Sequence, residues 1–240
     1  MSKIGSIGKL TKSKEIKTTT LYKFRALKTC TDLERIEDII ENGLFYCNDF
    51  LSFNDMNEGV YRPTDKNELT LEGKLEYKIC SFSGEEALSS ELMWGHYGNA
   101  GMGIIIEIKN GKNHPDVKQV IYLDETLKSN SLEEILTHKK LVWSYECEYR
   151  YISDAPIEKI KIGEIEKIYY GTPYKHLSNY KEIYNEHEDL QKYCKRIDKL
   201  KIICKKNNIK LEEFSEYKPH NLLNASKCLS NPSLFTSDRE

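Results

Sequence analysis

Several common signatures are missing from this chain of 240 residues, and each absence excludes a class of protein. No stretch approaches the roughly 18 consecutive apolar residues of a membrane helix, and the N-terminus has no apolar signal-peptide core. The seven cysteines include no C-x-x-C pair and follow no zinc-binding spacing. We therefore expect a cytoplasmic protein with reduced thiols, no membrane partner and no bound metal.

The two commonest nucleotide-binding motifs, G-x-G-x-x-G and G-x-x-x-x-G-K-[ST], are also absent. The glycine-rich run at 98–103 leads from an expected helix into an expected strand, which is the wrong order for a phosphate cradle. A Rossmann or P-loop scaffold is therefore not expected.

The net charge of −2 conceals an uneven distribution. Residues 1–20 hold five Lys and one Glu, and residues 192–210 hold seven Lys, one Arg and one Asp, which leaves −13 for the remainder. An acidic body with two basic appendages excludes a uniformly basic nucleic-acid binder but permits a local basic contact surface.

Periodicity divides the chain into four parts. We expect a flexible basic arm over 1–19 and an α+β core over 20–171, with a mixed or mostly antiparallel sheet. A helical extension with a basic stripe is expected over 172–214, and a loose tail over 215–240.

The clearest local prediction is a strand over 20–26 followed by a helix. Thr31 begins a T-D-L-E capping box, and Gly43 is expected to end this helix. Ser89 or Ser90 is expected to cap a short helix. Further strands are predicted over 75–82, 104–108, 117–123, 143–152, 157–162 and 165–170, the last two paired around Gly163, with helices over 132–140 and from about 178.

The most informative segment is W-S-Y-E-C-E-Y-R-Y-I, residues 143–152. As a continuous strand it places Glu146, Glu148 and Arg150 on one face and its aromatic residues on the other. Two carboxylates about 7 Å apart suit acid–base or cation-stabilising chemistry. The alternative is an ordinary solvated sheet face with a weak Glu–Arg pair.

Two further clusters carry polar groups suited to binding. In F-N-D-M-N-E, Asn54 and Asp55 can bind a substrate hydroxyl, an adenine edge or a metal, or else form an Asx-turn with their own backbone. In W-G-H-Y, His96 is a candidate general base or phosphate donor, or a half-buried structural histidine.

Basic residues give two more candidates. Arg25 can clamp a phosphate, or can be an ordinary charged residue on a strand. The helix near the end carries a stripe that can meet a nucleic-acid backbone or pair with the acidic body. The stripe consists of Lys192, Lys195, Arg196, Lys199 and Lys206.

Five motifs, in order, resemble a bacterial family known as domain of unknown function 2971, over residues 21–171. The chain departs from the family pattern at Met56, where Pro is usual, and at Cys80-Ser-Phe-Ser83, which is one residue longer than C-F-S. The matching residues are Leu21–Arg25, Phe53–Asp55 with Glu58, Cys80–Ser83, Met93–Tyr97, and Lys139 or Lys140 with Trp143, Tyr145, Glu146, Glu148 and Arg150.

The order of elements and the E-x-E motif are also similar to ADP-ribosyltransferases, which implies NAD as cofactor and a split sheet. The resemblance implies that Glu148 is the catalytic carboxylate, that Glu146 orients or deprotonates the acceptor, and that His96 contacts a phosphate or ribose. It also implies a cofactor-binding set in which Arg25 clamps the pyrophosphate and aromatic rings enclose nicotinamide or adenine. That set comprises Tyr22, Arg25, Asn54, Asp55, Trp94, Tyr97 and Arg150.

The implied function is modification of RNA, DNA or a protein, in a toxin or phage-defence setting. One alternative is a non-catalytic binding module of a defence or stress system, and another is a metal-dependent nuclease using Asp55, Glu58, Glu146 and Glu148. The catalytic interpretations require Arg25, His96 and the two late glutamates to converge on one cleft.

Overall fold

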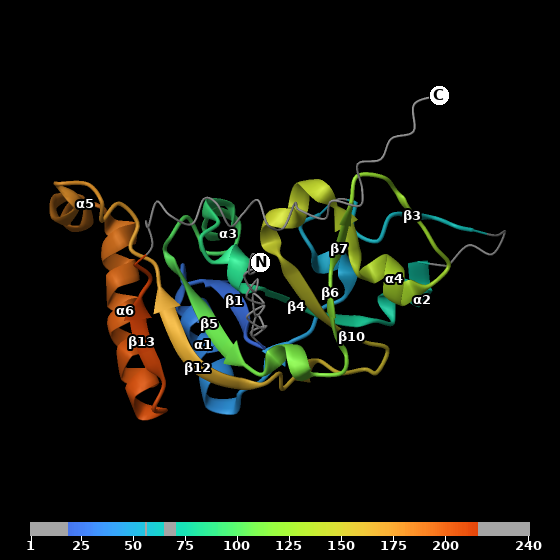
Figure 1. Ribbon diagram of the computed structural model, residues 1–240. Helices are drawn as coiled ribbons and strands as arrows, with labels where there is room; N and C mark the ends of the chain where they lie inside the picture. The colour runs from blue at the N-terminus through green and yellow to red at the C-terminus, as the bar shows by residue number, and fades with distance from the viewer. Residues whose placement is uncertain (1–18, 56, 65–70, 216–240) are drawn as a thin grey trace, which may run out of the picture.

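A mixed seven-stranded sheet forms the centre of the computed structural model, which describes residues 19–55, 57–64 and 71–215 (Figure 1). The strand order is β13-β12-β5-β1-β4-β10-β6, and neighbours are antiparallel except for the parallel pair of β12 and β13. The predicted α+β class with a mostly antiparallel sheet is confirmed. These strands are β1 (Leu21–Ala26), β4 (Lys78–Ser83), β5 (Gly103–Lys109), β6 (Val117–Gln119), β10 (Glu148–Ser153), β12 (Glu164–Tyr170) and β13 (Lys210–Glu213).

Helices and three small two-stranded sheets surround this sheet. The helices are α1 (Cys30–Asn42), α2 (Leu71–Leu75), α3 (Glu91–His96), α4 (Leu132–Leu136), α5 (Tyr180–Glu186) and α6 (Glu188–Lys206). The small sheets pair β2 (Phe45–Tyr46) with β11 (Lys159–Ile160), β3 (Tyr61–Arg62) with β8 (Leu127–Lys128), and β7 (Ile121–Leu123) with β9 (His138–Lys140). Short 3₁₀ helices are η1 (Phe50–Ser52), η2 (Glu85–Ala87), η3 (Gly111–Asn113) and η4 (Leu141–Glu146).

The main apolar core lies between the sheet and helices α1 and α6, on what we call the helical face. Residues two apart on a strand share a face, so Leu21 of β1 points into this core together with Ile106 of β5. Helix α6 adds Ile197 and Leu200 to the same core, and it lies beside β12 and β13 at the edge of the molecule (Figure 1). The region expected as a helical extension therefore contributes a strand and a helix to this sheet and core.

The opposite side of the sheet, which we call the site face, carries two smaller apolar clusters. One packs Tyr22 and Phe24 of β1 against α3, and the other packs Ile79 and Ile152 against Leu136 of α4. Glu148 and Arg150 of β10 also lie on this face, and both are buried.

Pairing in the later half of the chain differs from the prediction. Strands β11 and β12 flank Gly163 but do not pair with each other, because β11 pairs with β2 while β12 pairs with β5 and β13. The predicted helix over 132–140 ends at Leu136, since residues 138–140 pair with β7.

Two predicted elements are interrupted. The strand over 117–123 is split at Val120, whose amide donates to the carbonyl of Glu148 at 2.9 Å. The long helix is divided into α5 and α6 at His187, which has extended backbone angles. The predicted arm over 1–19 and tail over 215–240 lie outside the described residues, except for Thr19 and Ser215. In the described part of the chain, no helix combines the length and the apolarity needed to cross a membrane.

Helix α1 begins two residues earlier than predicted. The Thr29 hydroxyl accepts from the Asp32 amide at 3.1 Å, and the Asp32 carboxylate accepts from the Thr29 amide at 2.7 Å. The capping box is therefore Thr29 with Asp32 rather than Thr31 with Glu34. The predicted end at Gly43 is confirmed, with φ of 66° and its amide bonded to the Ile39 carbonyl at 2.8 Å.

This cap can be tested with two matched threonines. Thr29→Ala is expected to lower the free energy of unfolding by about 1 kcal/mol, because it leaves an amide of the first turn without its acceptor. Thr31 is the second residue of the helix, and Thr31→Ala should change the free energy of unfolding by less than about 0.5 kcal/mol. Urea denaturation of both variants measures the difference, and an equal loss would contradict the observed cap.

Candidate functional site: a buried ionic cluster beneath an aromatic rim

Five charged side chains from three separate parts of the chain meet on the site face, next to β4 and β10. We call them the ionic cluster, and each is less than a tenth exposed. Three carboxylates face two cations, so the cluster carries one excess negative charge when all five groups are ionised. Its members are Glu58, Lys139, Glu146, Glu148 and Arg150.

Arg150 is the centre of the cluster and is completely buried. Its guanidinium binds Glu58 through two hydrogen bonds of 2.6 and 2.9 Å, and Glu148 through two of 2.8 and 3.0 Å. The fifth N–H donates to the carbonyl of Leu136, and the ring of Phe53 lies 5.0 Å from the guanidinium. All five donors are thereby used, so Arg150 has none left for a cofactor. Its predicted cofactor-binding role is not supported.

Lys139 connects the two late glutamates. Its ammonium lies 2.5 Å from Glu146 and 3.2 Å from Glu148, and it sits over the ring of Trp143 at 5.0 Å from the centroid. Strand β9 positions this lysine through its parallel pairing with β7. The cluster is thus one continuous network in which each carboxylate contacts at least one cation.

The predicted strand over 143–152 is wrong in its first half. Residues 141–146 form η4, and Cys147 has a positive φ of 43° that ends the 3₁₀ helix before β10 begins. The alternation of side chains therefore starts only at Glu148. From there the prediction holds, because Glu148 and Arg150 share the site face. The alternative of a solvated face is wrong, since Glu146, Glu148 and Arg150 are all buried.

The two glutamates experience opposite electrostatic environments. Burial alone would raise the pKa of Glu148, but the charges of Arg150 and Lys139 outweigh it and lower that pKa to about 2. The pKa of Glu146 is raised, first by burial and then by the nearby charge of Glu148, against the opposing effect of Lys139. One carboxylate is held ionised, and the other retains a proton more readily.

A set of aromatic side chains lies over Glu146, and we call it the aromatic rim. The Tyr97 hydroxyl bonds to Glu146 at 2.5 Å and lies 3.0 Å from the side-chain oxygen of Asn54. The Nδ1 atom of His96 is 2.9 Å from the Tyr145 hydroxyl. His96 and the neighbouring Asn54 are exposed. The rings of Tyr97, Trp143 and Tyr145 are partly exposed. The rim consists of His96, Tyr97, Trp143 and Tyr145.

Three predicted site residues lie elsewhere. Arg25 is on the helical face of β1, because it alternates with Tyr22 and Phe24, and so does not join His96 and Glu146. Tyr22 is buried in the apolar cluster beneath α3. Trp94 packs edge-on against Phe24, and its indole N–H donates to the Leu88 carbonyl at 3.2 Å. The predicted convergence of Arg25, His96 and the two glutamates is therefore only partial.

The turn that carries Asn54 and Asp55 divides their roles. Asp55 is buried, and its carboxylate accepts from the Asn57 amide at 2.8 Å, as an Asx-turn does. This turn places Glu58 against Arg150, while Asn54 points to Tyr97. Asp55 therefore shapes the connection, and Asn54 belongs to the rim.

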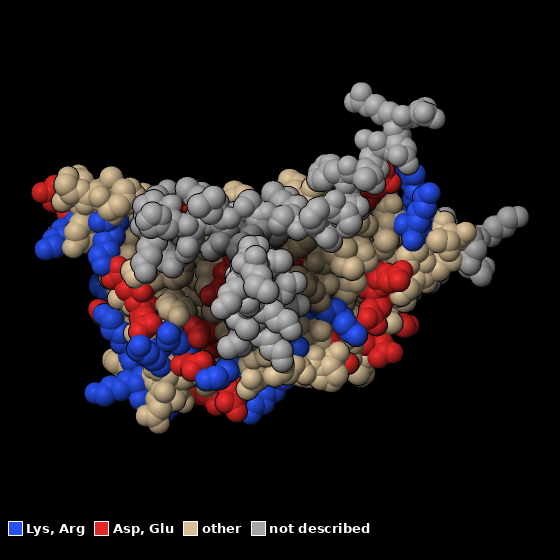
Figure 2. All heavy atoms as spheres, viewed as in Figure 1, with Lys and Arg blue, Asp and Glu red and all other residues tan. Residues whose placement is uncertain are grey.

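The basic stripe on α6 is only partly free. Lys192 pairs with Glu188 at 2.8 Å, Arg196 donates to the Leu27 carbonyl at 2.8 Å, and Lys206 pairs with Glu41 at 2.8 Å. Lys195 and Lys199 are exposed. Positive and negative side chains are intermixed on this side of the molecule in the view of Figure 2. Nucleic-acid binding by this stripe stays a prediction.

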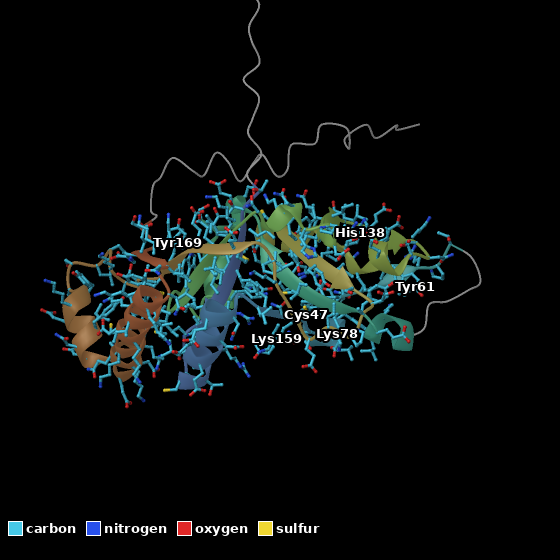
Figure 3. The ribbon with its side chains drawn as sticks, turned by 90° about the horizontal axis from the view of Figure 1, so that it is seen from below. Cys47, Tyr61, Lys78, His138, Lys159 and Tyr169 are labelled. Atoms are coloured by element: carbon cyan, nitrogen blue, oxygen red, sulfur yellow. The ribbon has the colours of Figure 1, made fainter. Side chains whose placement is uncertain are left out.

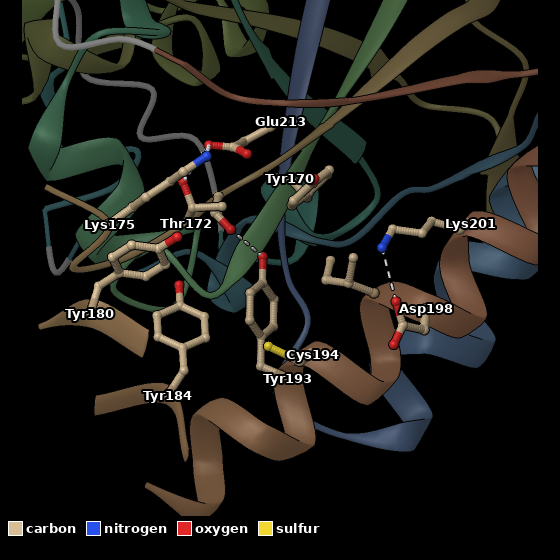
Figure 4. Close-up of a pocket in the computed structure, with 12 residues that line it drawn as sticks. Tyr170, Thr172, Lys175, Tyr180, Tyr184, Tyr193, Cys194, Asp198, Lys201 and Glu213 are labelled. Carbon is tan, nitrogen blue, oxygen red and sulfur yellow. Dashed lines mark hydrogen bonds and ion pairs between the residues drawn. The ribbon is translucent and has the colours of Figure 1, made fainter. Parts of the chain in front are cut away.

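A separate pocket of about 290 Å³ lies between α6 and the ends of β12 and β13 (Figure 4). The rings of Tyr180, Tyr184 and Tyr193 line it, and the ion pair of Lys175 with Glu213 lies at its edge. None of its lining residues belongs to the ionic cluster, the rim or the predicted site. This pocket is therefore distinct from the candidate site.

Sequence reasoning assigned no site role to Lys139, Trp143 or Tyr145. Lys139 carried a signal, since it occupies the lysine position of the K-x-x-x-W-x-Y-E-x-E-x-R motif. The two aromatics were expected in the core because the strand prediction extended through them. The break at Cys147 turns them toward the rim instead.

The ionic cluster offers little to a metal ion. Lys139 and Arg150 already engage the carboxylates of Glu58, Glu146 and Glu148. Among residues 19–55, 57–64 and 71–215, no group of three or more His, Cys, Asp or Glu side chains is arranged to hold a metal ion. The donor set therefore does not favour the arrangement required by the nuclease hypothesis.

Comparison with protein-family models, with curated proteins and with solved structures found no match to this chain. The resemblance to domain of unknown function 2971 and to ADP-ribosyltransferases stays a prediction that rests on the motif residues. Three of those motifs, around Asn54, His96 and Glu146, nevertheless meet at one place in the fold.

Removing the central guanidinium is expected to destabilise the fold strongly. Arg150→Met leaves Glu58 and Glu148 buried without their main cation, which should cost about 3–5 kcal/mol in the free energy of unfolding. Lys118→Met on neighbouring β6 is the matched control, because its partner Glu133 is exposed and the pair is worth less than about 1 kcal/mol. Urea denaturation at pH 7 compares the free energies of unfolding of the two variants. If Arg150→Met loses no more than Lys118→Met, the cluster contributes little to stability.

The low pKa of Glu148 predicts a specific loss of stability in acid. A carboxyl group with a lowered folded-state pKa stabilises fully above its ordinary value of 4.5, and this contribution disappears as the pH falls through about 2. Its size is on the order of 3 kcal/mol. Glu148→Gln, though less stable at pH 7, should lose less further stability than the wild type between pH 5 and 2. Urea unfolding at several pH values measures this, and parallel curves would contradict the assignment.

Proposed function

We propose that this site acts on the glycosidic bond of a nucleotide, with NAD as the substrate class to test first. The observation that carries the proposal is the position of Glu146, a buried carboxylate with a raised pKa directly beneath partly exposed aromatic rings. Aromatic rings bind nucleobases by stacking, and carboxylates stabilise the oxocarbenium-like state of glycosidic cleavage. These two requirements come together at this site.

Glu146 takes the reacting role in this proposal. As the bond between C1′ of the ribose and nicotinamide breaks, nicotinamide leaves with the bonding electrons, and ionised Glu146 stabilises the positive charge on the sugar. Water or an acceptor hydroxyl then attacks C1′ and gives its proton to Glu146. Tyr97 covers this carboxylate, so its hydroxyl must exchange its bond to Glu146 for one to the substrate.

The other predicted residues take different roles. Glu148 is fully engaged by Arg150 and Lys139, so we assign it to positioning rather than to contact with substrate. His96 and Asn54 are the exposed polar groups of the site and are suited to ribose hydroxyls. Arg25 lies on the other face, so the four-residue convergence required by the sequence-based catalytic interpretation is not met. The present proposal therefore rests on His96, Asn54 and Glu146 alone and contains no pyrophosphate clamp from β1. An RNA, DNA or protein acceptor and a split-sheet relationship to ADP-ribosyltransferases remain part of the proposal.

Nicotinamide release from millimolar NAD by the purified full chain, measured by chromatography, tests this function. Glu146→Gln is expected to lower the rate at least 100-fold, because the amide cannot accept the proton or stabilise the cation. Glu166→Gln, an exposed carboxylate paired with Lys109, is the matched control and should retain full activity. Since Glu146 must be ionised, the rate should rise with pH through a midpoint above the ordinary 4.5 of a glutamate.

Two outcomes would overturn the proposal. One is that NAD at millimolar concentration neither binds to nor is consumed by wild-type protein, with or without added RNA, DNA or protein acceptors. The other is that Glu146→Gln, shown by circular dichroism to be folded, turns over NAD at the wild-type rate.

A further inference from the structure

Two buried cysteines, Cys47 and Cys80, lie near each other in the core on the helical face of the sheet. Asn48 and Ile79 exchange both backbone hydrogen bonds, at 2.9 and 2.7 Å, in an antiparallel bridge. Cys47 and Cys80 are the residues next to this single bridge on the two segments. Opposite residues of an antiparallel pair have Cα atoms about 4.5–5.5 Å apart, so this position permits a disulfide.

The two thiol groups interact with each other. Cys47 and Cys80 lie close enough for each thiol to shift the pKa of the other. The Cys47 thiol donates to the Phe45 carbonyl at 4.0 Å, and the exposed fractions of Cys47 and Cys80 are 8% and 1%. In the view of Figure 3, Cys47 is labelled next to Lys159 and Lys78, and its amide bonds to the Glu158 carbonyl at 2.8 Å. The bridge of Asn48 with Ile79 therefore keeps the two cysteines close together.

The surroundings of Cys80 favour a negative charge. Lys23 and Arg25 of neighbouring β1 point to the same face, and neither forms an ion pair with a carboxylate in the described part of the chain. The Lys23 ammonium donates to the Ser81 carbonyl, and the Nε atom of Arg25 is buried without a hydrogen-bond partner. The thiolate of Cys80 is therefore the anion that can balance Lys23 and Arg25 on this face.

The thiol pKa values agree with this geometry. Burial would raise the pKa of Cys80, but the neighbouring Cys47 thiol and the charges of Lys23 and Arg25 lower it to about 7. The pKa of Cys47 is raised, chiefly by the neighbouring Cys80 and then by burial. Cys204 is equally buried at 1% exposure, but burial raises its pKa to about 11. The chain thus contains a matched buried thiol for comparison.

We propose that Cys47 and Cys80 form a reversible redox pair, in which Cys80 reacts with a hydroperoxide and Cys47 then closes a disulfide. The Cys80 thiolate attacks a peroxide oxygen, the O–O bond breaks, and the leaving oxygen takes up a proton, which gives a sulfenic acid. The Cys47 sulfur then attacks Cys80, the S–S bond forms, and the S–O bond breaks to release water. Two thiols lose two electrons to the hydroperoxide, and a dithiol reductant reverses the reaction.

Access to the buried pair comes from local opening. The segment around Cys47 is held by the two-residue pairing of β2 with β11 and by the single bridge of Asn48 with Ile79. Short ladders of this kind open at lower free energy than the central strands. A molecule as small as hydrogen peroxide reaches Cys80 through such opening.

The test is mass spectrometry of the purified full chain after treatment with hydrogen peroxide and blocking of remaining thiols. We expect a peptide linked through Cys47 and Cys80 that disappears after reduction with dithiothreitol. Cys47→Ser should stop the reaction at the sulfenic acid of Cys80, which dimedone traps. Cys204→Ser should leave the linked peptide unchanged.

Rates distinguish this pair from ordinary buried thiols. At pH 7, Cys80 in Cys47→Ser should react at least about tenfold faster with peroxide than Cys204, because far more of it is thiolate. Lys23→Met should slow Cys80 by removing one of its cations. The proposal fails if Cys80 reacts no faster than Cys204, or if peroxide links Cys47 and Cys80 no more often than other cysteine pairs.

Discussion

The double engagement of Arg150 is the interaction on which the site face depends. One guanidinium binds the carboxylates of Glu58 and Glu148 and the carbonyl of Leu136, so three distant parts of the chain meet at one side chain. A buried guanidinium is tolerated only when all its donors are satisfied. The turn before Glu58, the end of α4 and the start of β10 must therefore assemble together. The rim rests on that assembly, because Lys139 and Glu146 attach to it directly.

The cluster separates two neighbouring glutamates into different chemical states. Glu148 receives most of the available positive charge, which keeps it ionised and fully occupied. Glu146 receives only Lys139, and the charge of Glu148 opposes its ionisation. Carboxylates whose environments push their pKa values apart commonly divide structural and reactive roles. Of the two glutamates, Glu146 is the one bonded to a neutral tyrosine hydroxyl, which a substrate can replace.

The parts of this structure that follow from local pattern were predictable from the sequence, and those that depend on distant partners were not. The alternation of Glu148 and Arg150 gives their shared face, but it cannot tell that Glu58, some 90 residues away, covers that face. The positive φ of Cys147 is similarly invisible, since cysteine rarely adopts it. Likewise, alternation alone separates Arg25 from Tyr22, yet only the packing of α1 and α3 decides which face is the site.

Charged side chains are distributed unequally over the two faces of the same strands. The site face holds an excess of one carboxylate, whereas the helical face holds Lys23 and Arg25 without an ion-paired carboxylate. Burial lowers the pKa of Lys23, and the charges of Cys80 on its own face and of Glu148 on the other face oppose this shift only in part. Cys80 on the helical face and Glu148 on the site face therefore act on the same lysine, so Lys23 connects the two faces electrostatically.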